Sequence, residues 1–475
     1  MATELDIYTG KLEYKDVNFN FVFNGEELRL IPPAKNEKDV WYKILLMPIV
    51  EGTYTMASPK MDVPYLIGQC NENGHTLIFL TKQGAHIGAY NSVLIVEVAA
   101  YILCKTNSEP ISKMSFTCPE LDCIYPVTQG FSYTFDHEEF SNHGILSIKT
   151  EDYATTVTNP QNFQVDGKDV EISFGISRNP HFKVGLPPLT LHSTMILRFE
   201  PTEDYTFIVR LWFVAKEFLQ FMCYRRNIFI PVADLSTPAE EGKTRTFASF
   251  HMLNESGDEE LETLQKGRFI KLSYLSCKEG EILNDIAANR LYTRHIPDTY
   301  ASGRLINAAR FVMITAAFEW EFRRTYPDGI PRDSKDVEIE DTAMRAIQAL
   351  IDGSTGALKK KYKFLRYVIQ KSDSLEKKVV YAGTELDSVI GTFGRHLYSL
   401  NDTELIYSEM GKRLAEQRNH FAHGDLDIDL INESILDLIY TERIVYAMQL
   451  RYYGIDDHNI QKAINDLFRC GIMIE

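Results

Sequence analysis

Three side chains suited to phosphate chemistry lie close together near the carboxyl end of the chain. Arg418, Asn419 and His423 form the pattern R-N-x-x-x-H. A guanidinium can hold two phosphate oxygens at once, an amide can donate a further hydrogen bond, and an imidazole exchanges protons near neutral pH. His420 is a second imidazole in the same segment, and we consider it a helper or a substrate contact.

The spacing of this motif decides how one helix would present it. Asn419 and His423 are four residues apart and share a helix face, whereas Arg418 and His423 lie about 140° apart on a regular helix. One unbroken helix would therefore present the arginine and the histidine poorly to one phosphate. In a structural alternative, Arg418 pairs with Asp425 or Asp427, and His423 is only a turn residue.

The motif and its helical setting resemble the signature of the HEPN superfamily. In that signature an arginine and a histidine are separated by four to six residues, and an asparagine follows the arginine, as Asn419 follows Arg418 here. The family places the motif at the start of the last long helix of a small bundle, which this sequence predicts at residues 428–453. The resemblance covers about residues 300–460. A β-rich region before such a bundle is similar to the arrangement of ApeA-type anti-phage proteins.

The resemblance implies a metal-independent endoribonuclease without a cofactor. RNA carries its own nucleophile, the 2′-OH beside each phosphate, so the enzyme need only move protons and stabilise negative charge. The products would carry a 2′,3′-cyclic phosphate and a 5′-hydroxyl. The family further implies a homodimer or higher homo-oligomer, in which Arg418 of one subunit serves His423 of the other.

The biological role implied is bacterial abortive infection, in which a phage-derived trigger activates the enzyme to cleave host RNA. Loops such as those of tRNA expose unstacked bases and suit such an enzyme. The alternative is a catalytically inactive HEPN module that binds nucleotides or partners, with a β-rich domain that recognises a ligand. An intact R-N-x-x-x-H favours the enzyme, because inactive members tend to lose it.

Weaker candidates lie on the helices predicted before the motif. HEPN bundles often direct a polar residue from an earlier helix at the motif, and we assign this supporting role to Glu319. Six basic residues are candidate contacts to the RNA backbone: Lys359, Lys360, Lys361, Lys363, Arg366 and Arg395. Charge patterning alone favours the view that the basic residues form a solvated helix face. It likewise favours Glu319 as an ordinary carboxylate on a helix surface.

The chain is predicted to be α+β, with a β-rich front and an all-helical back. β-Branched and aromatic runs predict antiparallel strands at 18–23, 40–47, 76–79, 93–98, 170–174, 206–212 and 227–231. Asp166-Gly167 predicts a hairpin turn. Helical spacing of apolar residues predicts helices at 214–224, 302–326, 341–351, 358–370, 374–396, 403–416 and 428–453. We therefore expect a sensing or regulatory domain over 1–235, a linker over 236–266 and a helical nuclease domain over 267–475.

The net charge, the apolar runs and the cysteine content limit which partners and which cell compartment we expect for this chain. The net charge of −16 argues against broad nucleic-acid binding, and no DNA partner is expected. The longest apolar run, residues 92–104, is too short to span a bilayer, and the first residues do not form a signal peptide. Seven cysteines suit the reduced thiols of a cytoplasm. Two roles are possible for Cys70, His75, Cys118 and Cys123. They could bind a structural zinc ion, or the cysteines could have their commoner role as small buried residues.

Overall fold

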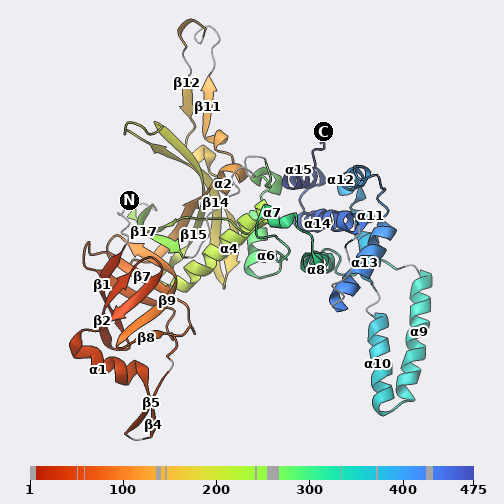
Figure 1. Ribbon diagram of the computed structural model, residues 1–475. Helices are drawn as coiled ribbons and strands as arrows, with labels where there is room; N and C mark the ends of the chain where they lie inside the picture. Colours follow the sequence, from red (N-terminus) through yellow and green to blue (C-terminus); the bar gives the residue numbers. More distant parts are fainter. Residues whose placement is uncertain are drawn as a thin grey trace. The chain divides into compact units, whose positions relative to one another are not determined.

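A computed structural model describes residues 7–474 except 51, 58, 135–140, 145–146, 241–242, 254–266, 333, 371–372, 424–429 and 431. The chain divides into two compact units, each built from several segments (Figure 1). The first, called the sheet unit here, comprises Met1–Met222, Arg226–Gln265 and Cys277–Ala288. The second, called the helical unit, comprises Cys223–Arg225, Lys266–Ser276 and Asn289–Glu475.

The sheet unit is built around a 13-stranded antiparallel sheet. Its strand order is β13-β14-β15-β10-β16-β17-β9-β3-β2-β1-β6-β7, and β8 pairs with β9. The strands are β1 (Tyr8–Tyr14), β2 (Val17–Phe23), β3 (Glu27–Ile31), β6 (Tyr65–Cys70), β7 (Thr76–Thr81), β8 (Gly88–Tyr90), β9 (Val93–Cys104), β10 (Ile111–Thr117), β13 (Gln161–Val165), β14 (Lys168–Pro180), β15 (Leu189–Thr202), β16 (Ala233–Pro238) and β17 (Thr244–Met252).

One end of this sheet closes on itself. Strand β7 pairs again with β9, so β9, β3, β2, β1, β6 and β7 surround a common core. Alternate residues of β2 point into it, because successive side chains of a strand point to opposite faces. Phe21 and Phe23 each meet Phe79 edge-on, with ring centroids 5.2 and 5.1 Å apart. The Asp166-Gly167 hairpin is confirmed between β13 and β14, with φ values of 51° and 79°.

Four sequence expectations for this unit are wrong or incomplete. Residues 40–47 are not a strand: α1 (Glu37–Val40) runs into a π-helical turn, Trp41–Leu45, before β4 (Leu46–Val50). Residues 206–212 belong to helix α4 (Tyr205–Cys223), in which buried aromatic and aliphatic residues recur at helical spacing. Residues 227–231 form no strand. The expected linker over 236–266 contains β17, a central strand of the sheet, and residues 254–266 lie outside the described residues.

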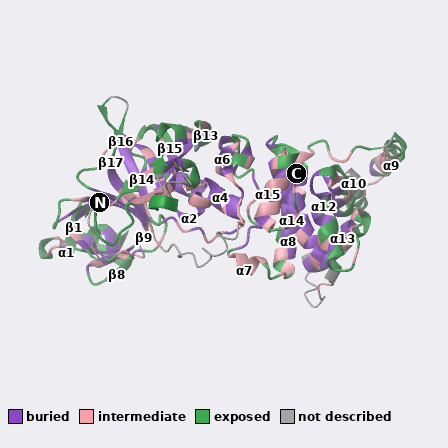
Figure 2. Cartoon of the chain, turned by 90° about the horizontal axis from the view of Figure 1, so that it is seen from above, coloured by how far each residue is buried: buried purple, intermediate pink, exposed green. Residues whose placement is uncertain are grey.

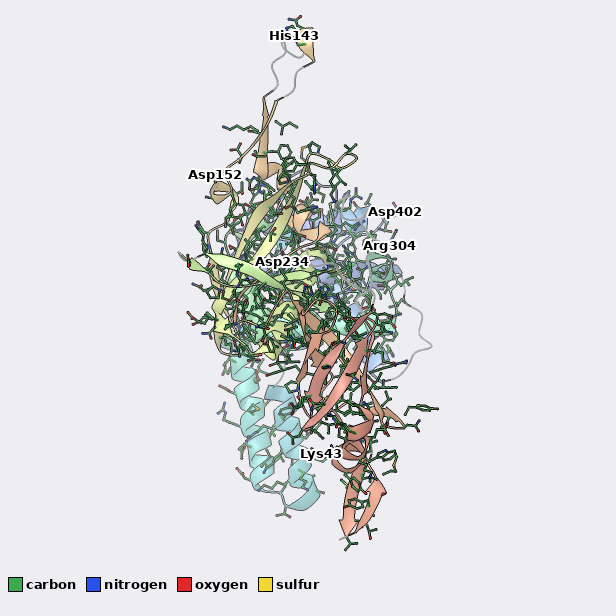
Figure 3. All side chains as sticks on the ribbon, turned by 90° about the vertical axis from the view of Figure 1, so that its left-hand side faces the viewer. Lys43, His143, Asp152, Asp234, Arg304 and Asp402 are labelled. Atoms are coloured by element: carbon green, nitrogen blue, oxygen red, sulfur yellow. The ribbon has the colours of Figure 1, made fainter. Side chains whose placement is uncertain are left out.

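The remaining elements of the sheet unit are short. β4 pairs with β5 (Thr53–Met56), and β11 (Phe131–Thr134) pairs with β12 (Ser147–Thr150). Figure 3 shows Lys43 near β4 and β5 and His143 beyond β11 and β12, at opposite ends of this unit. Helix α2 (Pro119–Ile124) packs on β15, and α6 (Glu279–Ala287) packs on β13. At α6 a side chain on Gly280 would come within 2.7 Å of the Asn162 carbonyl oxygen, so the close approach requires glycine.

The helical unit contains the elements that carry the motif. Its helices are α7 (Tyr300–Gly303), α8 (Ala308–Thr325), α9 (Ser334–Asp352), α10 (Gly356–Gln370), α11 (Leu375–Glu385), α12 (Asp387–Ser399), α13 (Tyr407–His423), α14 (Asn432–Tyr452) and α15 (Asp457–Phe468). Helix α13 packs on α8, α11 and α14, and α8 packs on α11 and α14. Helix α14 also contacts α12 and α15. Figure 2 shows buried residues along α14 and exposed ones along α9 and α10.

A β-rich front followed by a helical back confirms the α+β expectation. Two helix predictions need correction. The stretch 302–326 is two helices, because Asn307 caps the start of α8 by accepting a hydrogen bond from the Arg310 N–H. The stretch 374–396 is also two helices, α11 and α12, which meet at Leu386. In the described part of the chain, no helix combines the length and apolar character needed to cross a membrane.

Candidate active site

The motif lies at the carboxyl end of α13, and its final turn is anchored from the buried side. Met410, Leu414, Gln417 and Phe421 recur at helical spacing and are all buried. The ring of Phe421 meets Phe311 of α8 edge-on, with centroids 5.4 Å apart. This buried stripe continues the helix through the motif, so α13 extends beyond the predicted end at residue 416.

The position of the motif within the bundle differs from the expectation. It ends α13 instead of starting the last long helix, since α14 begins only at Asn432. Helix α13 is regular through His423, so Arg418 and His423 keep the unfavourable angular separation of a single helix. The side chain of His423, and the whole of Asp425 and Asp427, lie outside the described residues. The structural alternative for Arg418 at those aspartates therefore stays a prediction.

Arg418 is held by a carboxylate from another helix. Its Nη2 lies 3.2 Å from Oε2 of Glu319 on α8, and the other carboxylate oxygen of Glu319 lies 3.8 Å from Nζ of Lys378 on α11. Glu319 and Lys378 are largely buried, whereas the Arg418 side chain is 39% exposed. A single carboxylate thus joins two cations from two different helices, and the group carries a net positive charge beside solvent.

The neighbouring motif residues face solvent. Asn419 and His420 are both exposed. On a regular helix Asn419 and position 423 share one side, about 100–140° away from Arg418, which meets Glu319. One copy of the segment therefore directs Arg418 along the bundle surface and Asn419 away from it. The arrangement offers a fixed guanidinium for an anion, with polar groups on an adjacent face.

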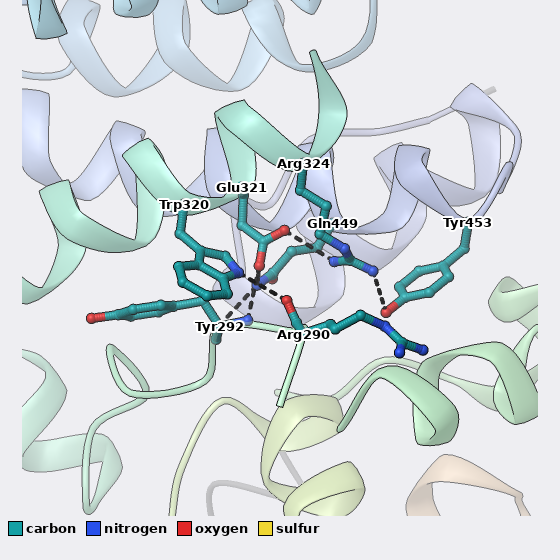
Figure 4. Close-up of polar contacts among 7 residues, drawn as sticks. All are labelled: Arg290, Tyr292, Trp320, Glu321, Arg324, Gln449 and Tyr453. Atoms are coloured by element: carbon teal, nitrogen blue, oxygen red, sulfur yellow. Dashed lines mark hydrogen bonds and ion pairs between the residues drawn. The ribbon is translucent and has the colours of Figure 1, made fainter. Parts of the chain in front are cut away.

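A buried network fixes the helix that carries Glu319 (Figure 4). Two residues further along α8, Glu321 accepts hydrogen bonds from Gln449 of α14 at 3.2 Å and from the Tyr292 N–H at 2.9 Å. Arg324 donates to Glu321 at 3.0 Å and to the Tyr453 hydroxyl at 2.7 Å. Burial raises the pKa of Glu321, and Arg324 opposes that rise. These bonds set the rotation of α8 and hence the direction of Glu319.

A second network fixes α13 itself. Arg413 donates two hydrogen bonds to the carboxylate of Asp437 on α14, at 2.7 and 2.8 Å, and Tyr398 of α12 donates to the same carboxylate. Asp437 is fully buried, and burial raises its pKa despite the paired guanidinium. Because Arg413 lies five residues before Arg418 on the same helix, this pairing limits rotation of α13 at the motif.

The supporting residues divide into two groups. The structure brings Glu319 to the motif, and it adds Lys378, for which nothing in the local sequence gave a signal. It does not link the predicted basic residues to Arg418: Arg395 pairs with Asp387 at 2.7 Å on α12, and Lys359, Lys360, Lys361 and Lys363 lie on α10. Their contact with RNA stays a prediction.

The zinc alternative is not supported. Among the described residues, which include all four candidates, no group of three or more His, Cys, Asp or Glu side chains is placed to hold a metal ion. Cys70 instead lies in the core enclosed by β1, β2 and β9, where burial raises the pKa of its thiol to about 11. Cys118 is also buried, as the commoner structural role of cysteine predicts.

Comparisons with known proteins give no relative from which a role could be transferred. No family model matches the chain, and neither the curated proteins nor the solved structures contain a significant match.

Proposed function

We propose that the helical unit is a metal-independent endoribonuclease of the HEPN type. Its catalytic residues are Arg418, Asn419 and His423, in the pattern R-N-x-x-x-H. The observation that carries the proposal is the ion pair between Arg418 and Glu319, which holds a guanidinium at the end of α13 next to exposed polar residues. A guanidinium fixed in this way suits the oxygens of a phosphodiester.

The proposed reaction is an internal transesterification. The 2′-OH of one nucleotide attacks the adjacent phosphorus, and the 5′-oxygen of the next nucleotide leaves. His423 takes or returns the proton, Arg418 contacts the non-bridging oxygens, and Asn419 donates a hydrogen bond to the developing charge. The ends are a 2′,3′-cyclic phosphate and a 5′-hydroxyl.

We further propose that two copies of the chain share each site. Arg418 and position 423 lie about 140° apart on one unbroken helix, so a single copy offers one phosphate only part of the set. Arg418 of one subunit acting with His423 of a second subunit removes this conflict. Exposed His420 is then a helper at the meeting point of the two helices.

The proposed biological role is cytoplasmic anti-phage defence by abortive infection. A phage-derived trigger acts on the sheet unit, and the helical unit then cleaves a host RNA, with tRNA loops as the favoured substrate because their bases are unstacked. The acidic chain suits this role, since a net charge of −16 keeps general RNA affinity low until a specific site is presented.

The test compares the intact chain with Arg418→Ala and His423→Ala variants in bacteria, with and without phage challenge. Lys412→Ala on the exposed face of α13 and His458→Ala on the exposed face of α15 are matched controls. RNA ends are mapped for cyclic phosphates, and circular dichroism verifies folding.

The expected result is new cyclic-phosphate ends at defined loops with the wild type and both controls. Both motif variants should lose these ends while remaining folded. Retention of protection and cleavage by both motif variants would make the motif structural and would favour the inactive binding module.

A further inference from the structure

Three arginines and one tyrosine of the helical unit form a cluster on elements that do not carry the motif. Tyr300 begins the short helix α7, and Arg304 directly follows the end of the same helix. Arg268 precedes the 3₁₀ helix Leu272–Leu275, and Arg469 directly follows the end of α15. The cluster therefore draws on three separate parts of the chain, which only the fold brings together.

The tyrosine ring holds two of the three guanidiniums. The central carbon of the Arg268 guanidinium lies 3.8 Å from the centroid of the Tyr300 ring, and that of Arg304 lies 5.9 Å from the same centroid. Both distances are within the range of a cation–π contact, in which the negative face of the ring attracts a cation. Arg268 is half-buried, whereas Arg304 and Arg469 are exposed, so solvent and a dissolved ion can reach the cluster.

The segment that carries Arg268 is attached to α15, the helix that Arg469 follows. Tyr274 donates a hydrogen bond to the carboxylate of Asp466 on α15 at 2.9 Å. Lys271 forms an ion pair with the same carboxylate at 3.6 Å. These two contacts limit the movement of Arg268 relative to Arg469. A site that is ordered before its ligand arrives loses less entropy on binding.

The positive charge of this cluster is not neutralised within the described part of the chain. Arg268, Arg304 and Arg469 form no ion pair with a described carboxylate. Asp466, the acidic residue of α15 that precedes Arg469 most closely, already pairs with Lys271. The whole chain has a net charge of −16, so a local excess of positive charge is not a general property of its surface.

The three guanidiniums also act on one another. Burial lowers the pKa of Arg268, and the charges of Arg469 and Arg304 lower it further, while Tyr300 opposes the shift. Arginine nevertheless keeps its proton in proteins, so three like charges repel one another in the unliganded chain. A bound anion would relieve this repulsion.

We propose that Arg268, Arg304 and Arg469 bind a small phosphorylated ligand through its terminal phosphate or pyrophosphate group. A guanidinium binds two phosphate oxygens with parallel hydrogen bonds. A terminal phosphate carries a charge of about −1.5 to −2 at neutral pH, whereas the RNA backbone spreads single charges along the strand. Because two of the cations meet at one ring and the third acts on them, the cluster suits charge concentrated in one group. This inference does not depend on the proposed nuclease.

The test measures binding of inorganic pyrophosphate to the full chain by isothermal titration calorimetry, in the presence of EDTA. Arg304→Gln, Arg469→Gln and the double variant change exposed side chains only, and circular dichroism verifies their folding. Arg345→Gln on α9 and Lys377→Gln on α11, also at exposed positions, are matched controls for the loss of one positive charge. Sodium chloride at equal ionic strength controls for a general effect of salt.

Wild type and both controls should bind pyrophosphate, and they should bind inorganic phosphate more weakly. Each change of Arg304 or Arg469 to glutamine should weaken binding about 10- to 100-fold, because a charge-assisted hydrogen bond to the ligand is lost. Arg304→Lys should keep more affinity than Arg304→Gln, since it keeps the charge. Competition by adenosine triphosphate would support an organic carrier of the group, and its exclusion would support the free inorganic ion.

Equal affinity of wild type and the double variant for pyrophosphate would overturn the inference. So would an absence of binding by wild type at about 1 mM pyrophosphate. Displacement of pyrophosphate by a single-stranded DNA oligonucleotide without terminal phosphates would also overturn it, because the cluster would then bind a nucleic-acid backbone. The Arg418 and His423 variants decide the nuclease proposal separately, so either proposal can fail alone.

Discussion

Arg418 and Glu319 lie 99 residues apart in the chain and form a hydrogen-bonded ion pair that joins the end of α13 to α8. The pair is only partly shielded from water, so its contribution to stability is small. The pair instead orients the Arg418 guanidinium, because a guanidinium bound on one side presents its remaining N–H groups on the other side. The predictions below treat Glu319 as a positioning residue for Arg418.

Glu319→Gln should reduce RNA cleavage about 10- to 100-fold while leaving the fold intact. The amide keeps the size of the side chain but loses the charge that orients Arg418, and small displacements of a catalytic group carry costs of this order. Single-turnover cleavage measures the effect, with exposed Glu416→Gln as control. Glu319→Asp, which keeps the charge, should recover part of the rate; equal rates for Glu319→Gln and wild type would contradict the positioning role.

Lys378→Met should weaken RNA binding and lower its salt dependence. Lys378 is one of two cations on Glu319, and its loss leaves the cluster without its excess positive charge. Each lost phosphate contact lowers the slope of log affinity against log salt by about one. Titrations at several salt concentrations measure the slope, and neighbouring Lys377→Met, at an exposed position, is the matched control. An unchanged slope would limit Lys378 to a structural role.

Asp437→Ala should destabilise the helical unit by about 3–5 kcal/mol. The change leaves the Arg413 guanidinium and the Tyr398 hydroxyl without their shared acceptor in a buried place. Urea unfolding followed by circular dichroism measures the loss. Glu281→Ala, which breaks an exposed pair with Lys278, should cost less than about 1 kcal/mol. A similar small cost for both changes would show that the buried network contributes little.

The free energy of unfolding should decrease as pH rises from about 4.5 to about 7, because of Glu442. Burial raises the pKa of Glu442 to about 7, while Arg310, Tyr224 and Arg443 oppose the rise. In this window the folded state keeps a proton that the unfolded state has lost, so the free energy of unfolding decreases as pH rises. Urea unfolding at pH 5, 6, 7 and 8 should show wild type losing about 2–3 kcal/mol more than Glu442→Gln across the window. Parallel profiles would exclude Glu442 as the titrating group.

Turn signals in the sequence predicted local structure better than runs of apolar residues did. Asp166-Gly167 specifies its hairpin through two adjacent positive φ angles, a preference these residues carry by themselves. The stretch 206–212 was assigned to the wrong element, because aromatic and aliphatic residues such as Phe207 and Trp212 suit a buried strand and a buried helix equally. Helix length at the motif was underestimated for a related reason, since Phe421 has a partner only in the folded bundle.

The candidate site was predictable only as far as the motif and the resemblance reach. The motif and the resemblance point to Arg418, Asn419, His423 and Glu319, and in the structure Glu319 contacts Arg418. Lys378 could not be found, because its relation to Glu319 arises from the packing of α8 and α11 and leaves no spacing pattern in the chain.

The segmented composition of the two units limits how the chain can be cut. Tyr224, whose hydroxyl donates to Glu442, belongs to the helical unit. In the chain, strands β16 and β17 and helix α6 of the sheet unit lie between Tyr224 and the main segment of the helical unit. Residues Cys277–Ala288 return to the sheet unit, where Asn284 accepts a hydrogen bond from the Gln164 N–H of β13. A fragment beginning at residue 267 would therefore lose Tyr224 from its core and carry α6 without its sheet. The helical unit consists of three separate segments of the chain, so no single proteolytic cut can separate it intact from the sheet unit.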